Sequence, residues 1–393
     1  MNLDIDSLSR EMTGEMGAAL FLELSKASWN QLRCTEIQEF GIAFGSHQGL
    51  IRSRHEDRLA VAQISAANGQ SYLVAVVCDG VGGSKNGDLA ASIAVVTLLA
   101  ELSRVKTALS GEQILCHVVR RMDEKIRSCL SGSGLTTVSV VLATSAGEFL
   151  GCSIGDSRIY TWEPLHEKKL TQISEDDTFG NEAKRLNLQD VSALAQKGLL
   201  ASLSQALGEA GRDAGELNIN VHKCEEFSRS VILCSDGCWK HDNLGFELVV
   251  TNAKSALESS RRALALANWA GGSDNSSVII LEDKQKLIDW CVRNPARNVG
   301  SPHVTIWFAD QKLMFIVNYI FSGGYADSGL DTIDRKSVKR KSRAKQKVGL
   351  LPPKQLDFVE NIESDKRLPL SERPKIEISV DPSMGDEGNH KIK

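Results

Sequence analysis

The sequence predicts an α+β protein built as a layered sandwich of sheets and helices. Two groups of apolar, strand-like segments are each followed by helical segments, and glycine-rich turns join several of the strands as hairpins. The chain shows no regular alternation of strand and helix, which a doubly wound parallel sheet requires. Antiparallel sheets with helices packed on them are therefore favoured.

The first group of strands follows a stretch expected to form an N-terminal helical extension, residues 1–38. Leu20, Leu24 and Ala27 share one face of that stretch. Strands are predicted at 41–49, 59–64 and 72–78. Amphipathic helices are predicted at 88–102 and 112–130, where apolar side chains recur at helical spacing.

The second group begins after a glycine-containing break at residues 132–134. Polar, irregular chain with short helical pieces is expected at 171–210. The predicted strands are 136–143, 148–154, a short segment through Tyr160 and Trp162, 231–234 and 276–281, and the predicted helices are 244–250 and 255–269.

The C-terminal region changes in character after Asp283. We expect the main domain to span 39–284, followed by a small apolar annex of unknown role at 285–330, either a hairpin or a helix. Residues 331–393 have the composition of a disordered, charged tail. Its basic cluster at 335–347 is either solvated chain or a binding site for an acidic partner or nucleic acid.

Bulk composition is that of an ordinary globular protein, with 42% hydrophobic and 24% charged residues. A net charge of −4 gives no reason to expect binding to nucleic acid or to a membrane. The nine cysteines lack the pairing of a zinc site and indicate buried thiols in a reducing compartment. Because the first residues lack the basic flank and apolar core of a signal peptide, we expect a cytoplasmic protein. We also expect it to be monomeric.

Acidic residues stand where several predicted strands begin or end. Asp79 follows the strand at 72–78 and is itself followed by Gly80. Taken singly, such a pattern is a strand followed by a glycine turn. Comparable acidic turns recur at Glu56, Asp57, Asp156, Asp236 and Asp274.

These acidic turns indicate a metal site. Buried carboxylates are costly unless paired or metal-bound, and sites made of oxygen atoms alone select Mg²⁺ or Mn²⁺. Arg52 adds a planar fork suited to a phosphate group. Metals together with an arginine point to phosphoryl chemistry.

Seven motifs, in order, carry a resemblance to a known family. They are R-x-x-x-E-D at 52–57, DGVGG at 79–83, G-x-T-T at 134–137, GDSR at 155–158, SQALG at 204–208, CSDG at 234–237 and SDNSS at 273–277. Together they cover about 240 residues. Residues 41–283 resemble the metal-dependent protein serine/threonine phosphatases of type 2C, the PPM family, in their bacterial form.

The resemblance implies a four-layer α-β-β-α sandwich of two antiparallel sheets flanked by helices, with two Mg²⁺ or Mn²⁺ ions in a cleft and a third, weaker ion. Asp79 would bridge the two ions with help from the Gly80 carbonyl, and Asp236 and Asp274 would hold the first ion. Glu56 would lie by the second ion. Asp156 would hold the third ion together with Asp236.

Three further roles are implied by the resemblance. Asp57 would hold metal-bound waters, and Arg52 would bind the substrate phosphate. Asn275 would contact the metal-binding residues without binding a metal itself. A water activated between the metals would attack phosphorus in line, without a protein nucleophile. The implied partners are a phosphoprotein substrate and a cognate Ser/Thr kinase whose action the enzyme reverses in a bacterial signalling system.

The chain departs from the family pattern at three positions. Val81 stands where eukaryotic members have a histidine, His55 stands where the family has an asparagine, and Asp177 replaces the histidine of another motif. The last change lies in the segment at about 171–203, which the resemblance implies is a flap over the cleft. The sequence does not show how this flap is built. A catalytically weak pseudophosphatase that binds a phosphoprotein or a kinase is therefore the alternative to an active phosphatase.

Overall fold

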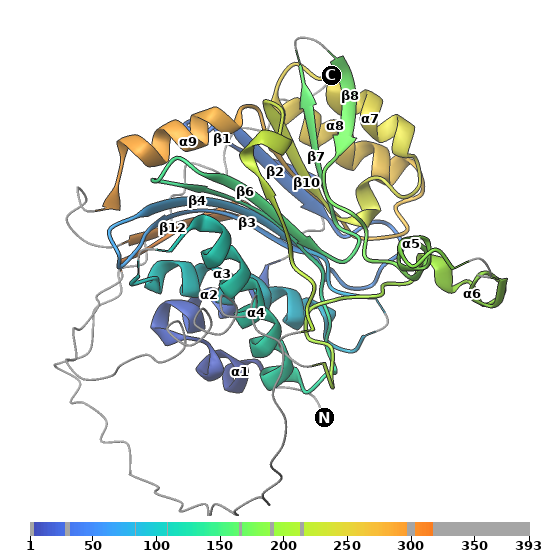
Figure 1. Ribbon diagram of the computed structural model, residues 1–393, viewed down its shortest axis with the longest axis horizontal. Helices are drawn as coiled ribbons and strands as arrows, with labels where there is room; N and C mark the ends of the chain where they lie inside the picture. Colours follow the sequence, from blue (N-terminus) through green and yellow to red (C-terminus); the bar gives the residue numbers. More distant parts are fainter. Residues whose placement is uncertain are drawn as a thin grey trace, which may run out of the picture. The chain divides into compact units, whose positions relative to one another are not determined.

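A computed structural model of the chain describes residues 4–316, apart from 28–31, 83, 108, 165–166, 189–191, 213–215 and 297–302. Across these ranges, a pair of antiparallel sheets packs face to face, with helices on the outer faces (Figure 1). The predicted α+β class and the four-layer sandwich are confirmed. The tail predicted at 331–393 lies outside the described residues.

The first sheet has six strands in the order β1-β2-β11-β10-β7-β8. Its strands are β1 (Arg33–Ile37), β2 (Ile42–His47), β7 (Arg158–Glu163), β8 (Glu167–Gln172), β10 (Ser230–Cys234) and β11 (Ser276–Leu281). The central pair sets Val231 opposite Leu281 and Cys234 opposite Val278. The segments that carry Asp236 and Asp274 thus meet at one end of this sheet.

The second sheet has seven strands in the order β13-β12-β3-β4-β5-β6-β9. Its strands are β3 (Arg58–Ser65), β4 (Ser71–Cys78), β5 (Val138–Thr144), β6 (Phe149–Ile154), β9 (Asn220–Lys223), β12 (His303–Phe308) and β13 (Gln311–Ile316). β4 is the middle strand and is buried along its whole length. Asp79 follows it directly, so that the carboxylate lies at the end of the sheet's centre.

Strand alternation explains why residues 231–234 and 278–281 are apolar without a break. Side chains on a strand point alternately to the two faces of its sheet. In β10, Val231 and Leu233 belong to the core between the sheets, whereas Ile232 and Cys234 pack with the core that also contains residues of α7 and α8. Both faces of the strand are covered, so both sets of positions are apolar.

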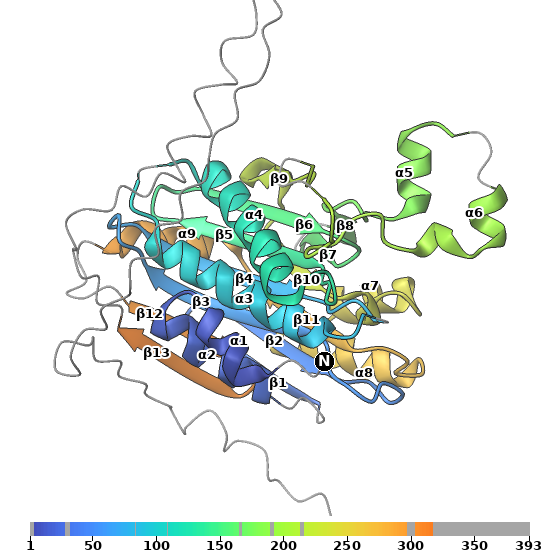
Figure 2. The ribbon, with the colours of Figure 1, turned by 90° about the horizontal axis from the view of Figure 1, so that it is seen from below.

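The helices form the outer layers of the sandwich. α3 (Gly87–Arg104) packs on β3 and β4, and α4 (Gly111–Leu130) packs on β5, β6 and α3. α2 (Gly14–Lys26) packs against α3, and α1 (Ile5–Glu11) against α2 (Figure 2). On the other side, α7 (Asn243–Thr251) contacts β8, and α8 (Ala256–Trp269) contacts β2 and β11.

A segment between β8 and β9 projects to one side of the sheets. It contains α5 (Phe179–Arg185), α6 (Ser192–Gln196) and the 3₁₀ turn η1 (Leu199–Ala201), and Figure 2 shows α5 and α6 away from both sheets. Two further 3₁₀ turns are η2 (Cys224–Glu226) and η3 (Asp236–Cys238). The short helical pieces predicted in this polar stretch are thus confirmed, although β8 was not predicted.

The ends of the fold differ from the sequence-based expectation. β1 begins at Arg33, inside the range expected to be purely helical, and pairs with β2. At the other end, α9 (Lys284–Arg293) packs on β4 and β5, and the β12–β13 hairpin pairs with β3. Within the described part of the expected annex, the hairpin therefore extends the seven-stranded sheet and α9 packs on that sheet. The division of the chain into domains stays a prediction.

No helix in the described ranges is both long enough and apolar enough to cross a bilayer.

Candidate active site

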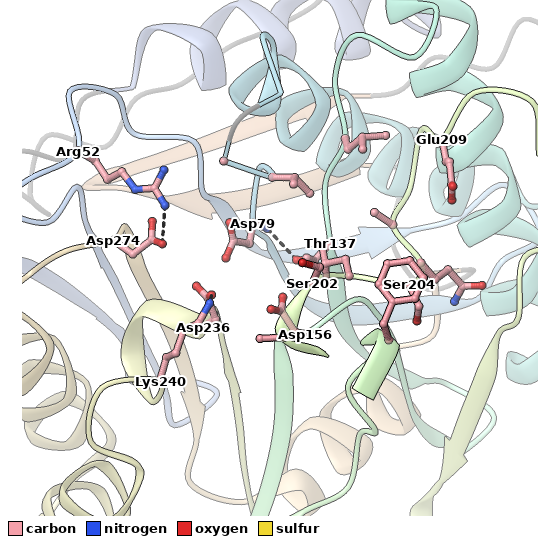
Figure 3. Close-up of a pocket in the computed structure, with 18 residues that line it drawn as sticks. Arg52, Asp79, Thr137, Asp156, Ser202, Ser204, Glu209, Asp236, Lys240 and Asp274 are labelled. Carbon is pink, nitrogen blue, oxygen red and sulfur yellow. Dashed lines mark hydrogen bonds and ion pairs between the residues drawn. The ribbon is translucent and has the colours of Figure 1, made fainter. Parts of the chain in front are cut away.

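A cavity of about 470 Å³ lies where strand ends from both sheets meet (Figure 3). Five of the residues predicted for the site line it, although they are spread over more than 200 positions of the sequence: Arg52, Asp79, Asp156, Asp236 and Asp274. The remaining predicted residues do not line the cavity: Glu56, Asp57, Gly80 and Asn275. The acidic turns thus converge in the folded protein.

Close backbone packing explains two of the glycines beside these acids. A Cβ atom on Gly237 would lie 1.9 Å from the carbonyl oxygen of Asn275. A Cβ atom on Gly80 would lie 2.5 Å from the carbonyl carbon of Gly87. Neither contact is possible, so any larger residue at these positions would push apart the loops that carry Asp236 and Asp79.

Asp79 is positioned by the G-x-T-T segment. Its amide donates to Thr137 Oγ1 at 3.1 Å, and its carbonyl oxygen accepts from Thr136 Oγ1 at 2.9 Å. Burial raises the pKa of Asp79 well above its usual range, and the negative charges of Asp57, Asp236, Asp156 and Asp274 add to the effect. The protein thus assembles negative charge at this point, and none of the described residues forms an ion pair with Asp79.

Asp156 lies in the GDSR turn between β6 and β7 and shows the same effect. Burial, followed by the charge of Asp236, raises its pKa to about 7. The neighbouring Arg158 does not compensate, since its guanidinium donates to Asp176 at 2.7 Å. Crowded oxygen donors with raised pKa values are typical of a site that takes up cations.

Arg52 reaches the cavity from the loop after β2. Its Nη2 donates to Asp274 Oδ2 at 2.6 Å, and 37% of its side chain is exposed. Burial alone would lower the pKa of Arg52, but Asp274, Glu56 and Asp79 raise it overall, so the guanidinium stays charged. Asp274 binds one nitrogen of the guanidinium, and the exposed part of the group remains available to an anion.

Lys240 is a cavity residue that the sequence analysis missed. Its Nζ donates to Asp236 Oδ2 at 2.6 Å, across the turn η3. Burial alone would lower the pKa of Lys240, but the charges of Asp236, Asp156 and Asp274 raise it overall. The four-residue spacing from Asp236 was the available signal, but it predicts a contact only where the chain turns helically.

Asp57 lies behind the cavity and is buried. Its Oδ2 accepts hydrogen bonds from Ser235 Oγ at 2.8 Å and Ser277 Oγ at 2.7 Å. Its Oδ1 has no hydrogen-bond partner among the described residues. Burial raises the pKa of Asp57 to about 7, although the two hydroxyls oppose this.

Asn275 fixes the loop that carries Arg52, Glu56 and Asp57. Its Oδ1 accepts from the Glu56 amide at 2.7 Å, and its Nδ2 donates to the carbonyl oxygens of Gln48 at 2.6 Å and Arg54 at 3.1 Å. Burial and the charge of Asp88 raise the pKa of Glu56. The asparagine therefore joins two motifs that are more than 200 residues apart.

Two of the departures from the family pattern have structural partners. His55 forms hydrogen bonds with Ser46 Oγ and with the carbonyl oxygen of Asp57, and it does not line the cavity. Asp177 Oδ2 accepts from the Gly155 amide at 3.0 Å and from Gln205 Nε2 at 3.1 Å. Asp177 therefore connects the GDSR turn to the SQALG segment, several residues of which line the cavity.

As placed, the carboxylates do not form a finished coordination shell. Among the described residues, no three histidine, cysteine, aspartate or glutamate side chains are close enough together to hold one ion. Two of the carboxylates take protein cations as partners, Asp274 with Arg52 and Asp236 with Lys240. The donors surround a common cavity, but they do not converge on a single point.

Comparisons with known proteins agree with this geometry. Residues 52–269, more than half of the chain, match the protein-family model described as Protein phosphatase 2C. The serine/threonine phosphatase stp of Listeria welshimeri is 26% identical over 252 residues, which cover 61% of this chain and 94% of that protein. The serine/threonine protein phosphatase PstP of Mycobacterium tuberculosis is 28% identical over 256 residues, covering 60% of this chain and 44% of PstP.

Solved structures share the fold. The serine/threonine phosphatase of S. agalactiae superposes with a TM-score of 0.50 at 20% identity, over 62% of this chain and 99% of that one. A bacterial serine phosphatase gives a TM-score of 0.50 at 20% identity, over 62% and 97%. The relatives are thus bacterial serine/threonine phosphatases. This chain belongs to the protein phosphatase 2C family.

Proposed function

We propose that this protein hydrolyses phosphoserine and phosphothreonine in proteins with the help of Mg²⁺ or Mn²⁺, reversing a Ser/Thr kinase in a bacterial signalling system. The observation that carries the proposal is the convergence of Asp79, Asp156, Asp236, Asp274 and Arg52 on one cavity. The names of the curated bacterial relatives support the reaction and the kind of substrate.

The donor set fits hard divalent cations. No histidine or cysteine occurs among the described residues that line the cavity, whereas carboxylates are plentiful there. Asp57 Oδ1, buried and without a hydrogen-bond partner among the described residues, is a further acceptor. We assign Asp79, Asp236, Asp274, Glu56 and the Gly80 carbonyl to two ions, with Asp57 accepting from their waters.

When bound, such ions would activate water and offset charge on the phosphoryl group. Arg52 would orient the phosphate, because a guanidinium matches two phosphate oxygens at once and is already held near the acids by Asp274. Val81 lines the cavity and carries no proton for the departing serine or threonine oxygen. In this chain we expect that proton to come from water.

The test is release of phosphate from a phosphothreonine peptide by the full chain. We expect release that requires Mn²⁺ or Mg²⁺ and falls strongly in Asp236→Asn. Asp289→Asn, which removes an exposed carboxylate on α9, is the matched control and should keep full activity. Undiminished activity of Asp236→Asn with metal in excess would refute the assignment.

The alternative is a pseudophosphatase that binds phosphoproteins without turnover. The altered positions 55 and 177 motivate it, but both residues have local hydrogen-bond partners and leave the acidic cavity in place. Tight binding of the phosphopeptide with no hydrolysis in any divalent metal would favour the binding module instead.

A further inference from the structure

Lys240 places a protein cation inside the acidic cavity. The Lys240 ammonium lies 2.6 Å from Asp236 Oδ2. Figure 3 shows the Lys240 side chain beside Asp236, with Asp156 on a neighbouring segment of the chain. Of the described residues that line the cavity, only Arg52 and Lys240 are basic. Since Arg52 is paired with Asp274, Lys240 is the basic side chain of the cavity that pairs with Asp236.

The local structure holds Lys240 at this position. Its backbone amide donates to the Asp236 carbonyl at 2.9 Å, which closes the turn η3. The preceding residue, Trp239, is covered by the guanidinium of Arg158, whose central carbon lies 3.2 Å from the ring centroid. Arg158 is fixed in turn by Asp176. The residue that precedes Lys240 is therefore held in place by Arg158.

We propose that the Lys240 ammonium takes the place of a third divalent cation beside Asp236 and Asp156, so that this protein binds two metal ions. The proposal rests on the proposed function, which assigns two ions to the other acids of the cavity. An ammonium ion donates to the same carboxylate oxygen that a third cation would need, and its charge repels a dication at close range. Unlike a weakly bound ion, it does not depend on metal concentration.

Binding of Mn²⁺ to the full chain tests this directly, by calorimetry and by the loss of the free Mn²⁺ resonance signal. We expect about two ions per chain in the wild type and about three in Lys240→Met, which keeps the length of the side chain but not its charge. The additional ion should disappear in Lys240→Met with Asp156→Asn. Lys240→Arg keeps the charge and should bind about two ions, as should the matched surface control Lys26→Met.

Each outcome separates this inference from the proposed function. Three ions in the wild type, or no gain in a folded Lys240→Met, would overturn the inference and leave the phosphatase intact. An unchanged ion count with a raised KM for the phosphopeptide would place Lys240 on the substrate and also overturn it. Absence of metal binding and of hydrolysis in the wild type would instead defeat the proposed function. If Lys240→Met fails to fold, the counts for the wild type and Lys240→Arg still decide.

Discussion

Two acidic regions of this protein are neutralised in different ways. Asp123, buried on α4, accepts from the Gly208 amide at 2.8 Å and forms ion pairs with Arg212 at 2.7 Å and Arg127 at 3.1 Å. Asp79, at the cavity, has no ion pair among the described residues and lies among other carboxylates. The first acid is balanced by the chain itself, whereas the second, under the proposed function, is balanced by bound metal ions.

This contrast separates structural from functional acids. A carboxylate with two arginines and a backbone donor stabilises the fold, and its loss leaves buried positive charge behind. Carboxylates gathered without matching arginines repel one another and oppose folding. Such a cluster is typical of a functional site. Substitutions in the two regions should therefore affect different properties.

The largest effect is expected from Asp79→Asn. Loss of the carboxylate assigned to both ions should lower kcat/KM by about 10³-fold, equivalent to about 4 kcal/mol. The thermal midpoint in EDTA should stay equal or rise, because one repelling charge is gone. Phosphopeptide kinetics and a melting curve measure the two quantities, and a large loss of stability would contradict the contrast.

Asp123→Ala should show the reverse pattern. Leaving Arg127 and Arg212 without their partner should destabilise the protein by about 3 kcal/mol. The kcat/KM per folded molecule should change by less than about tenfold, since Asp123 does not line the cavity. Urea unfolding gives the stability. If activity fell as far as in Asp79→Asn while stability held, Asp123 would belong with the functional acids.

Arg52→Lys should lower kcat/KM by about 10- to 100-fold, because a lysine keeps the charge but not the two-pronged geometry. Stability should change little, since the Arg52 side chain is 37% exposed and its ion pair is with Asp274. Full activity of Arg52→Lys would show that Arg52 does not hold the substrate phosphate through its two-pronged guanidinium. Arg33→Lys, at an exposed pair with Asp310, is the matched control.

The smallest effect concerns pH. Burial raises the pKa of Asp57 to about 7, so the native protein holds this proton more tightly than the unfolded chain, where aspartate titrates near pH 4. Stability from this group is present below about pH 4 and is lost as the pH rises through about 7. In EDTA the melting temperature should fall over this window by several degrees more in the wild type than in Asp57→Asn. Equal falls in both would exclude Asp57 as the cause.

The sequence predicted the central elements better than the edges. β4 and β10 are apolar runs bounded by glycine or polar turns, and the predicted bounds of both lie within a residue or two of the observed ones. The strands β1 and β9 were missed because they carry polar, partly exposed residues and lie at sheet edges, where burial imposes little pattern. α9 was given no range of its own, because the annex at 285–330 was expected to be either a hairpin or a helix, whereas its described part contains both.

For the site, motifs placed the acids but not their partners. The resemblance carried by the seven motifs implied that Asp79, Asp156, Asp236 and Asp274 share one cleft, and all four line one cavity, although their roles stay a prediction. Lys240 was missed because its contact depends on a single 3₁₀ turn, which spacing alone does not reveal. The flap was not interpretable, and its contribution to the cavity, including Phe179 and Ser202, emerged only from the structure.

The β12–β13 hairpin bears on how the protein can be shortened. The family match stops at residue 269, so a shortened protein that ends near residue 284 would still contain the whole matched range. Such a cut would strip β12 from β3, a largely buried strand with an apolar run at 59–62, and expose an unpaired backbone edge. Bare, uncharged edges invite strands of other molecules. A truncated enzyme intended to remain in solution should therefore extend through Ile316.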